Sequence, residues 1–348
     1  KIKIQCISFN DKKKKFSLKK INHALFIPKM TWSKLTYLEN DTIINVICDR
    51  PYETDDYITD FDQFLKLLDS KKRILKKNNS IFCRISGRPL RIINNFGRQP
   101  LGNGFIKKKD FIKEYFFNMQ TGFCNYSKMF QLFYQPDPKK MFHMNYPFSS
   151  SSSKQMLVHF KKFADFIINS EFINNNKKSL IIELGSNDGI MLKNFVNKNI
   201  DHIGIEPASN VAKMAKKKGL NVINDFFSYK LAKKIIKNYG KADVIVAANV
   251  MSHIPNIVEI IKGFKILLKK KGVIIFEDPY LADIIKKNAY DQIYDEHVFY
   301  FSVHSINFLF SKFGLEIIDL IPQNTHGGSM RYILANKGIY KKKEKIKN

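Results

Sequence analysis

The stretch from Ile181 to Gly189, IIELGSNDG, constrains the fold of this chain more than any other. Its apolar start predicts a short strand buried on both faces, and the residues after Gly189 predict a helix over 189–198. Gly185 and Gly189 lie between the two. Because glycine has no Cβ, the backbone can turn sharply there and let a ligand approach free N–H groups. The third glycine of the dinucleotide fingerprint is missing, so phosphate is not the first ligand that we expect.

An acidic residue ends the next predicted strand. That strand is HIGIEP, and Glu206 lies at its carboxyl end. In nucleotide-binding folds an acid at this place accepts hydrogen bonds from both hydroxyls of a ribose. The glycine loop and Glu206 together predict a nucleoside ligand.

The chain has 348 residues, 44% of them apolar, which is enough for two or three domains with a sizeable core. Its formal net charge of +28 would ordinarily suggest a nucleic acid or an anionic membrane as partner. The lysines, however, are scattered in short runs such as 12–15, 107–109 and 216–218, which is typical of solvated helix faces and turns. We therefore expect no nucleic-acid partner, while a local basic patch for an anionic substrate stays open.

Four cysteines, no secretory leader and no apolar run of membrane-spanning length predict a reducing, cytoplasmic location and no membrane partner. The chain starts at Lys1 rather than at a methionine and ends in a lysine-rich run. Both ends favour a segment of something longer.

Residues 1–68 are predicted to be β-rich. The runs IKIQCISF, ALFIP, SKLTYLE and TIINVICD alternate with turn signals, including NDKKKK, and suit an antiparallel meander that ends in a helix. The runs ALFIPKMTW and YETDDYITDFDQF resemble the C-terminal half of cupin sugar 3,4-ketoisomerases. That resemblance implies a partial barrel without the catalytic histidines of the earlier strands, so we expect no isomerase activity, a surface role for His23 and an exposed sheet edge.

Residues 69–80 are polar and without periodicity, which predicts a linker. In residues 81–140, Cys83 is paired with Ser86 and Cys124 with Ser127, where zinc knuckles would carry Cys-x-x-Cys. A serine hydroxyl is too weak a ligand to replace a thiolate. We interpret residues 81–140 as a small, degenerate zinc-ribbon-like domain that binds substrate, keeps only Cys83 and Cys124, and holds either no zinc or zinc at weak occupancy.

Residues 141–170 give an aromatic loop, a serine run and an amphipathic helix with apolar positions at 156, 160, 163, 164 and 167. The serine run fits a flexible linker, or equally a substrate-facing loop or helix cap. From 178 onward short apolar strands alternate with helices predicted at 208–218, 228–239, 256–268 and 303–313. This predicts a mostly parallel sheet with ligands at the carboxyl ends of its strands and, from GLEIIDLI and SMRYILAN, an antiparallel hairpin at one edge.

Polar residues end four of these strands in turn. After the glycine loop and Glu206 come Asp225, which can accept from an adenine amino group, Phe226, which can pack on the ring, and Asn249. Each alone is better explained as a cap or a turn. Their order, however, resembles the class I S-adenosylmethionine-dependent methyltransferase fold. The resemblance implies S-adenosylmethionine as cofactor, held in residues 141–348 by Gly185, Ser186, Asn187, Gly189, Glu206, Pro207, Asp225, Phe226 and Asn249.

A longer resemblance covers residues 81–335. The runs FCRISG, YPFSSSSS, ELGSNDG, NVMSHI, YDQIYDEHVFYFS and THGGSMRY are similar to those of deoxysugar C-methyltransferases, which methylate a nucleotide-linked 4-keto sugar at C3. The resemblance implies a nucleotide-linked keto-deoxysugar, of the dTDP type, as substrate. Two positions depart from the family: Phe148 stands where a second tyrosine is common, and Asp295 where a histidine is common.

Forming a C–C bond to a methyl sulfonium requires an enolate, and hence a base with a pKa near 7. We expect His297 to be this base, with Glu296 orienting an imidazole or helping in proton transfer. Tyr294 and His253 are candidate donors to the enolate oxygen, although a core tyrosine and a helix-start histidine explain them equally well. Tyr146 could line the sugar pocket. We further expect a loop at 326–329 over the substrate and Arg331 available to a phosphate.

Two rival functions stay open. One is an O- or N-methyltransferase for another small molecule, and the other is a non-catalytic binding or assembly module. The C-methyltransferase hypothesis requires that Glu206 and His297 share one cavity.

Overall fold

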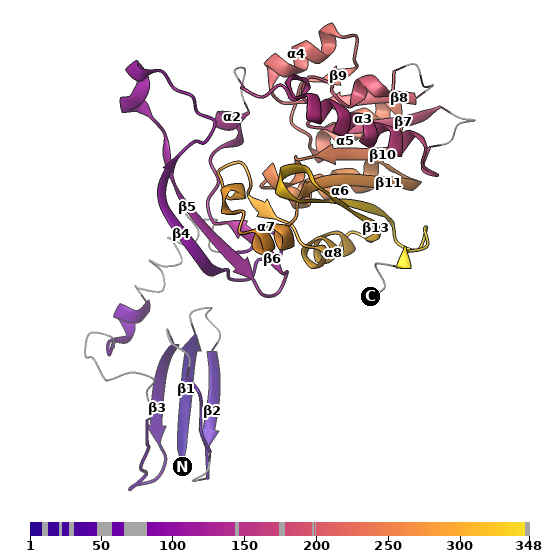
Figure 1. The fold of residues 1–348 in the computed structure, drawn as a ribbon. Coiled ribbons are helices and arrows are strands. Elements are labelled where there is room, and N and C mark those ends of the chain that lie inside the picture. Colours follow the sequence, from indigo (N-terminus) through magenta and orange to yellow (C-terminus); the bar gives the residue numbers. More distant parts are fainter. Residues whose placement is uncertain are drawn as a thin grey trace. The chain divides into compact units, whose positions relative to one another are not determined.

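The computed structural model describes residues 1–8, 13–20, 23–27, 31–46, 58–65, 82–142, 146–173, 178–196, 198 and 200–344. The chain forms two compact units, Lys1–Asn78 and Asn79–Asn348 (Figure 1). The predicted linker at 69–80 lies outside the described residues, and the predicted boundary between 140 and 141 stays a prediction.

The first unit is a three-stranded antiparallel sheet. Strand β1 (Ile2–Ser8) lies between β2 (Lys13–Leu18) and β3 (Thr31–Tyr37). Alternate residues of β1 are buried on one face, which is the pattern of a half-buried strand. The predicted β-rich character is therefore confirmed, with β2 and β3 as the edges of this sheet.

Three details of the first unit were predicted wrongly. The lysines at 13–15 begin strand β2 instead of belonging to a turn, because an edge strand can point lysines to solvent. The described parts of ALFIP and TIINVICD, residues 24–27 and 42–46, form no strand. Phe26 and Ile43 are each 87% exposed, whereas Leu25 and Ile44 pack, partly buried, against the core of this unit, so only part of the apolar character of these runs reflects burial. Of the predicted helix at the end of this unit, residues 61–65 are described and are helical.

The second unit is built on a seven-stranded sheet with the order β13-β14-β11-β10-β7-β8-β9. Its strands are β7 (Ser179–Leu184), β8 (Ile200–Ile205), β9 (Val222–Ile223), β10 (Ala242–Ala248), β11 (Leu268–Pro279), β13 (Leu315–Gln323) and β14 (Ser329–Asn336). The five strands β9, β8, β7, β10 and β11 are parallel, whereas β14 is antiparallel to both β11 and β13. The predicted α/β class and the antiparallel edge hairpin are confirmed.

Five helices lie where the sequence predicted them. They are α3 (Lys154–Ile168), α4 (Ser209–Lys217), α5 (Tyr229–Tyr239), α6 (Ile257–Leu267) and α8 (Val303–Ser311), and α7 (Leu281–Lys287) is additional. The helix predicted over 189–198 is wrong, because the chain there makes turns and one 3₁₀ turn, η4 (Leu192–Asn194). The side-chain amide of Asn194 donates to the carbonyls of Ile190 and Met191, and so competes for the acceptors that an α-helix would use.

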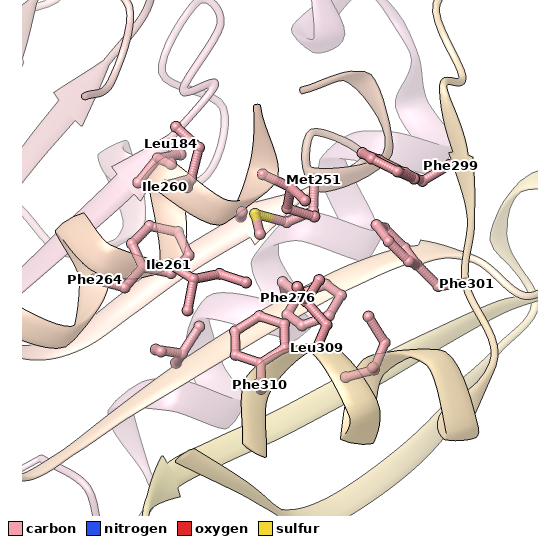
Figure 2. Packing of buried hydrophobic residues seen from close by; sticks show 14 of the residues in the cluster. Leu184, Met251, Ile260, Ile261, Phe264, Phe276, Phe299, Phe301, Leu309 and Phe310 are labelled. Atoms are coloured by element: carbon pink, nitrogen blue, oxygen red, sulfur yellow. The ribbon is translucent and has the colours of Figure 1, made fainter. Parts of the chain in front are cut away.

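Two apolar cores cover the two faces of the large sheet. In β7, Ile182 and Leu184 pack with α5, α6 and α8, whereas Ile181 packs with α3 and α4. Figure 2 shows part of the first core, with Phe276 beside Phe310. The ring of Phe276 stacks on the rings of Phe310 and Tyr332 at centroid distances of 5.7 and 4.8 Å. Burial on both faces explains why these strands are continuous apolar runs.

A smaller antiparallel sheet belongs to the same unit. Its order is β12-β6-β5-β4, with β4 (Arg91–Pro100), β5 (Phe116–Cys124), β6 (Met129–Leu132) and β12 (Phe299–Tyr300). The short element η2 (Lys108–Lys113) lies between β4 and β5, whereas α2 (Pro138–Met141) and η3 (Ser150–Ser152) lead from β6 to α3. Strand β12 comes from the C-terminal part of the chain and directly follows the predicted catalytic residues. It forms one edge of this sheet.

A buried ion pair links β11 to β14. Arg331 and Glu277 are register partners, and the Nε and Nη2 atoms of Arg331 donate to Glu277 Oε2 at 3.0 and 2.8 Å. The guanidinium lies 3.6 Å from the ring centroid of Phe163. Burial raises the pKa of Glu277, but the hydrogen bond from His159 and the charge of Arg331 outweigh burial and hold it below its ordinary value. The expectation that Arg331 is available to a phosphate is therefore wrong, because its donors serve Glu277.

Breaking this pair should be costly. We expect Arg331→Met to lower the free energy of unfolding by about 3–5 kcal/mol, because it leaves the Glu277 carboxylate buried without its partner. Adding Glu277→Gln should recover part of the loss. The measurement is urea unfolding followed by circular dichroism. The control is Lys161→Met, which removes the exposed ion pair with Asp165 and should lower the free energy of unfolding by less than about 0.5 kcal/mol. The prediction would be contradicted if Arg331→Met and Lys161→Met lowered the free energy of unfolding equally.

Candidate active site

A cavity of about 610 Å³ lies at the carboxyl ends of the parallel strands. Glu206 and His297 both line it, so the condition set by the C-methyltransferase hypothesis is met. The predicted site residues that line it are Tyr146, Gly185, Asn187, Glu206, Pro207, Phe226, Asn249, His253, Tyr294, Glu296 and His297. Three predicted residues, Ser186, Gly189 and Asp225, do not line it.

The two glycines after β7 are required by their conformation and by space. Gly185 has φ +64° and Gly189 φ +80°, in the left-handed region that side chains rarely adopt. A Cβ on Gly185 would lie 2.3 Å from Val250 Cγ2, and one on Gly189 would lie 2.1 Å from Leu220 Cδ1. Gly189 is thus a packing position behind the cavity wall, which explains why it does not line the cavity.

Glu206 is held by two backbone N–H groups. Its Oε2 accepts from Asn187 N at 2.9 Å, and its Oε1 accepts from Ala208 N at 2.8 Å. Burial raises the pKa of Glu206, and the two backbone hydrogen bonds oppose that rise. Each carboxylate oxygen can accept two hydrogen bonds, so each keeps one acceptor position for a ligand.

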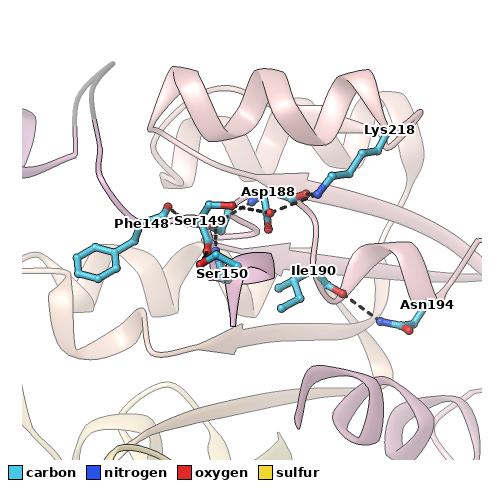
Figure 3. Close-up of polar contacts among 9 residues, drawn as sticks. Phe148, Ser149, Ser150, Asp188, Ile190, Asn194 and Lys218 are labelled. Carbon is cyan, nitrogen blue, oxygen red and sulfur yellow. Dashed lines mark hydrogen bonds and ion pairs between the residues drawn. The ribbon is translucent and has the colours of Figure 1, made fainter. Parts of the chain in front are cut away.

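The serine run is a wall of the cavity rather than a linker (Figure 3). Ser149 Oγ donates to Asp188 Oδ2 at 2.8 Å, and Ser150 N donates to Asn187 Oδ1 at 2.9 Å. Ser153 caps α3 through its side chain. The structure therefore favours the second interpretation of this run, a loop and cap that face the site.

His297 has a defined tautomer. Its Nδ1 lies 2.8 Å from the carbonyl oxygen of Gln292, which can only accept, so we assign the proton to Nδ1. Nε2 is then an acceptor, and the Tyr294 hydroxyl lies 3.4 Å from it. Burial lowers the pKa of His297 to about 4, below the value near 7 that we expected for a base. The imidazole is therefore neutral at neutral pH.

Glu296 faces a different imidazole. Its Oε1 accepts from Asn103 Nδ2 at 2.6 Å, and its Oε2 lies 3.9 Å from His253 Nδ1. The His253 ring stacks on Phe142 with an interplanar angle of 13°, and its centroid is 5.1 Å from that of His297. Burial raises the pKa of Glu296 to about 7. The imidazole that Glu296 can orient is therefore that of His253, and Glu296 is the group in this cavity with a pKa near neutrality.

Three family models match this chain. They are described as "Methyltransferase domain" over residues 158–320, "WxcM-like, C-terminal" over 4–69 and "Putative zinc binding domain" over 83–142. The first model covers the seven-stranded sheet and the glycine loop. The match to a methyltransferase domain over residues 158–320, together with the order of the sheet, supports the predicted class I methyltransferase fold and its cofactor, S-adenosylmethionine. The predicted cofactor is thereby confirmed.

The chain is also similar to individual proteins. It is 30% identical over 251 residues to the C-methyltransferase NovU of Streptomyces niveus, which covers 71% of this chain and 59% of NovU. The chain therefore spans less than two thirds of that relative. Two similar solved structures are an S-adenosylmethionine-dependent methyltransferase from Clostridium acetobutylicum (16% identity, TM-score 0.40, 51% of this chain and 92% of that one) and the plantazolicin methyltransferase BpumL (13%, 0.43, 54% and 88%).

The residues of the knuckle pair do not fit a structural zinc ion. Cys83 Sγ lies 3.2 Å from Ser127 Oγ, and Cys124 Sγ lies 3.3 Å from Ser86 Oγ. Each cysteine thus pairs with the serine of the other knuckle, where four thiolates would close a tetrahedron. Two thiols and two neutral hydroxyls are a poor donor set for zinc. Within the described ranges, no three His, Cys, Asp or Glu side chains group closely enough to hold a metal ion.

Two further residues line the cavity: Glu183, which was not predicted as a site residue, and His326, which belongs to the loop expected over the substrate at 326–329. Glu183 lines the cavity from β7, and burial raises its pKa well above the ordinary value. His326 lines it from the loop before β14 with φ +51°, a strained conformation for a residue other than glycine. The only signal for Glu183 was an acid inside an apolar strand.

Within the part of the chain that the structure describes, no helix has the length and apolar character to span a bilayer.

Restoring the missing thiolates should restore a zinc site. We expect the double variant Ser86→Cys with Ser127→Cys to bind zinc stoichiometrically, because two hydroxyls become two thiolates at positions already 3.2 and 3.3 Å from the existing sulfurs. The parent chain should hold little zinc after dialysis against a chelator. The measurement is metal content by mass spectrometry, together with the thiolate charge-transfer absorption of the cobalt form. A parent chain that keeps one equivalent of zinc would contradict this reading of the knuckles.

Proposed function

We propose that this chain methylates carbon C3 of a nucleotide-linked keto-deoxysugar, of the dTDP type, through an enolate and with S-adenosylmethionine as methyl donor. The observation that carries the proposal is the shared cavity, which is lined both by Glu206 and by Tyr294, Glu296, His297 and His253. The similarity to NovU, a C-methyltransferase by name, supports the reaction class. The WxcM-like segment at residues 4–69 supports a sugar pathway by association only.

The donor end of the cavity fits a nucleoside. The two free acceptor positions of Glu206 suit the two ribose hydroxyls, and Phe226 offers a ring face to the adenine. Asn249 has φ +56°, and its buried Oδ1 has no partner among the described residues, which leaves it for the donor. The remaining proposed donor contacts come from Gly185, Asn187 and Pro207, which line the cavity. Ser186 is fully buried outside the cavity lining, and Asp225 is exposed beside Phe226, so neither is assigned a contact. When bound, the sulfonium supplies an electrophilic methyl group.

The acceptor end fits proton removal next to a ketone. We assign the base to His297 Nε2, which is an acceptor in its tautomer and is neutral at neutral pH. The buried Nε2 of His253 has no partner among the described residues, and with the Tyr294 hydroxyl it can donate to the enolate oxygen. In its protonated form, Glu296 can donate to His253 Nδ1, which leaves the single ring proton of the neutral His253 on Nε2, where it can be donated to the enolate oxygen. Tyr146 lines the sugar side.

The two ends must be brought together in a dry site. Glu206, Glu296 and His297 are each at most 5% exposed, and burial lowers the pKa of His253, His297 and His326 and raises the pKa of Glu296 and Glu206. Holding an enolate next to a methyl donor in such a site supplies rate through proximity and through the exclusion of water.

The donor end is tested by ligand binding. We expect Glu206→Gln to weaken S-adenosylhomocysteine binding by about 10–100-fold, because a hydrogen bond to a charged group contributes about 1.5–3 kcal/mol and each 1.4 kcal/mol is tenfold. Titration calorimetry measures the dissociation constant, and Glu171→Gln, at an exposed position in the turn after α3, is the matched control. Unchanged affinity in Glu206→Gln would remove Glu206 from the donor site, and no binding by the parent chain would favour a non-catalytic module.

The acceptor end is tested without the donor. We expect the parent chain to exchange the C3 proton of a dTDP-4-keto-6-deoxysugar for deuterium, and His297→Asn to slow this exchange by about 10²–10⁴-fold, the usual contribution of a general base. Nuclear magnetic resonance follows the loss of the C3 signal. His304→Asn, at an exposed histidine of α8, should behave as the parent. Absence of exchange in a parent chain that binds S-adenosylhomocysteine would favour an O- or N-methyltransferase.

A further inference from the structure

We propose that Asn103 is a positioning residue of the active site, which holds the Glu296 carboxylate against His253 from a turn that precedes it by almost two hundred residues. The turn is Leu101–Gly104, closed by a hydrogen bond from Gly104 N to Leu101 O of 3.1 Å. It follows strand β4 of the smaller sheet. The catalytic consequence rests on the function proposed above, whereas the contact itself can be tested without it.

Two consecutive residues of the turn, Gly102 and Asn103, contact two consecutive residues, Asp295 and Glu296, of the segment with the proposed catalytic residues. Gly102 N donates to Asp295 Oδ1 at 3.1 Å, and Asn103 Nδ2 donates to Glu296 Oε1 at 2.6 Å. A Cβ on Gly102 would lie 3.0 Å from Asp295 Oδ1, so a larger residue would push the turn away. This register places the amide of Asn103 on one oxygen of Glu296 only.

The second oxygen of Glu296 is the one that faces His253. Because Asn103 occupies Oε1, the carboxylate is fixed with Oε2 at 3.9 Å from His253 Nδ1. An amide N–H group can donate to a carboxylate but cannot take its proton at neutral pH. Asn103 therefore orients Glu296 and favours its ionised form without joining in proton transfer.

The surroundings of Glu296 make this hydrogen bond consequential. Burial raises the pKa of Glu296 to about 7, and the bond from Asn103 opposes that rise. The other titratable groups around it are Tyr146, His253, Tyr294, Asp295 and His297. None of these is a cation at neutral pH that would replace Asn103, since burial lowers the pKa of both histidines. Loss of Asn103 should therefore move the titration of Glu296 upward.

The test follows Glu296 itself. The infrared carboxyl band that Glu296→Gln removes is titrated in the parent, in Asn103→Ala and in Asn103→Asp. We expect the midpoint to rise by about one pH unit in Asn103→Ala, since a lost hydrogen bond to a charged group corresponds to a shift of about that size. Asn103→Asp should raise it further, because a second carboxylate then faces Glu296. Asn118→Ala, at an exposed asparagine of the neighbouring strand β5, should leave it unchanged.

Activity supplies the second readout. The rate of deuterium exchange is measured against pH, and the limb that disappears in Glu296→Gln is assigned to Glu296. In Asn103→Ala this limb should shift by the same number of pH units as the infrared midpoint. A folded Asn103→Ala variant whose Glu296 titrates as in the parent would overturn the proposal, whatever its activity. Absence of exchange in the parent would instead overturn the proposed reaction, while the infrared titration would still decide the role of Asn103.

Discussion

The carboxylate of Glu206 is the constraint on which the site depends. It accepts one backbone N–H from the glycine loop after β7 and one from the residue before α4, and so fixes the ends of two neighbouring strands relative to each other. The loop can approach Glu206 because Gly185 takes a left-handed conformation and has no Cβ; a Cβ at this position would clash with the side chain of Val250. A ligand that uses the remaining acceptor positions of Glu206 therefore binds to a loop that is already ordered, so the loss of conformational entropy on binding is small.

Charge in this protein is divided between surface and cavity. The chain carries a formal net charge of +28, yet none of the described residues that line the cavity is a lysine or an arginine. Desolvation moves the buried groups toward their neutral forms, with a raised pKa for Glu183 and Glu296 and a lowered pKa for His253 and His297. Such a site suits proton transfer to and from a carbonyl substrate. It also implies that the diphosphate of a nucleotide sugar meets no cationic side chain of the cavity wall, since Arg331, the candidate for that role, is paired with Glu277.

The sequence predicted what local pattern determines. Buried strands such as β7 and amphipathic helices such as α3 follow from the spacing of apolar residues, and the glycine loop with Glu206 follows from strand ends. Contacts between distant segments could not be found in this way. The bond from Asn103 to Glu296 joins residues 193 positions apart, and the pairing of Arg331 with Glu277 depends on which strand enters the sheet between β11 and β13. The helix predicted after Gly189 failed for a local reason, because Asn194 takes up carbonyls that propensity alone assigns to a helix.

The two Cys-x-x-Ser turns, at 83–86 and 124–127, and the segment 294–297 with the proposed catalytic residues are linked by strand pairing. Val298 and strand β12 follow His297 at once; Val298 O accepts from Leu132 N, and β12 pairs with β6. Strand β6 in turn pairs with β5, which ends at Cys124. A fold that needed zinc to close the knuckles would make the position of His297 depend on metal supply. With thiol–hydroxyl pairs in place of a metal and Cys83 in the same apolar core as Phe276, the support of His297 comes from packing and strand pairing instead.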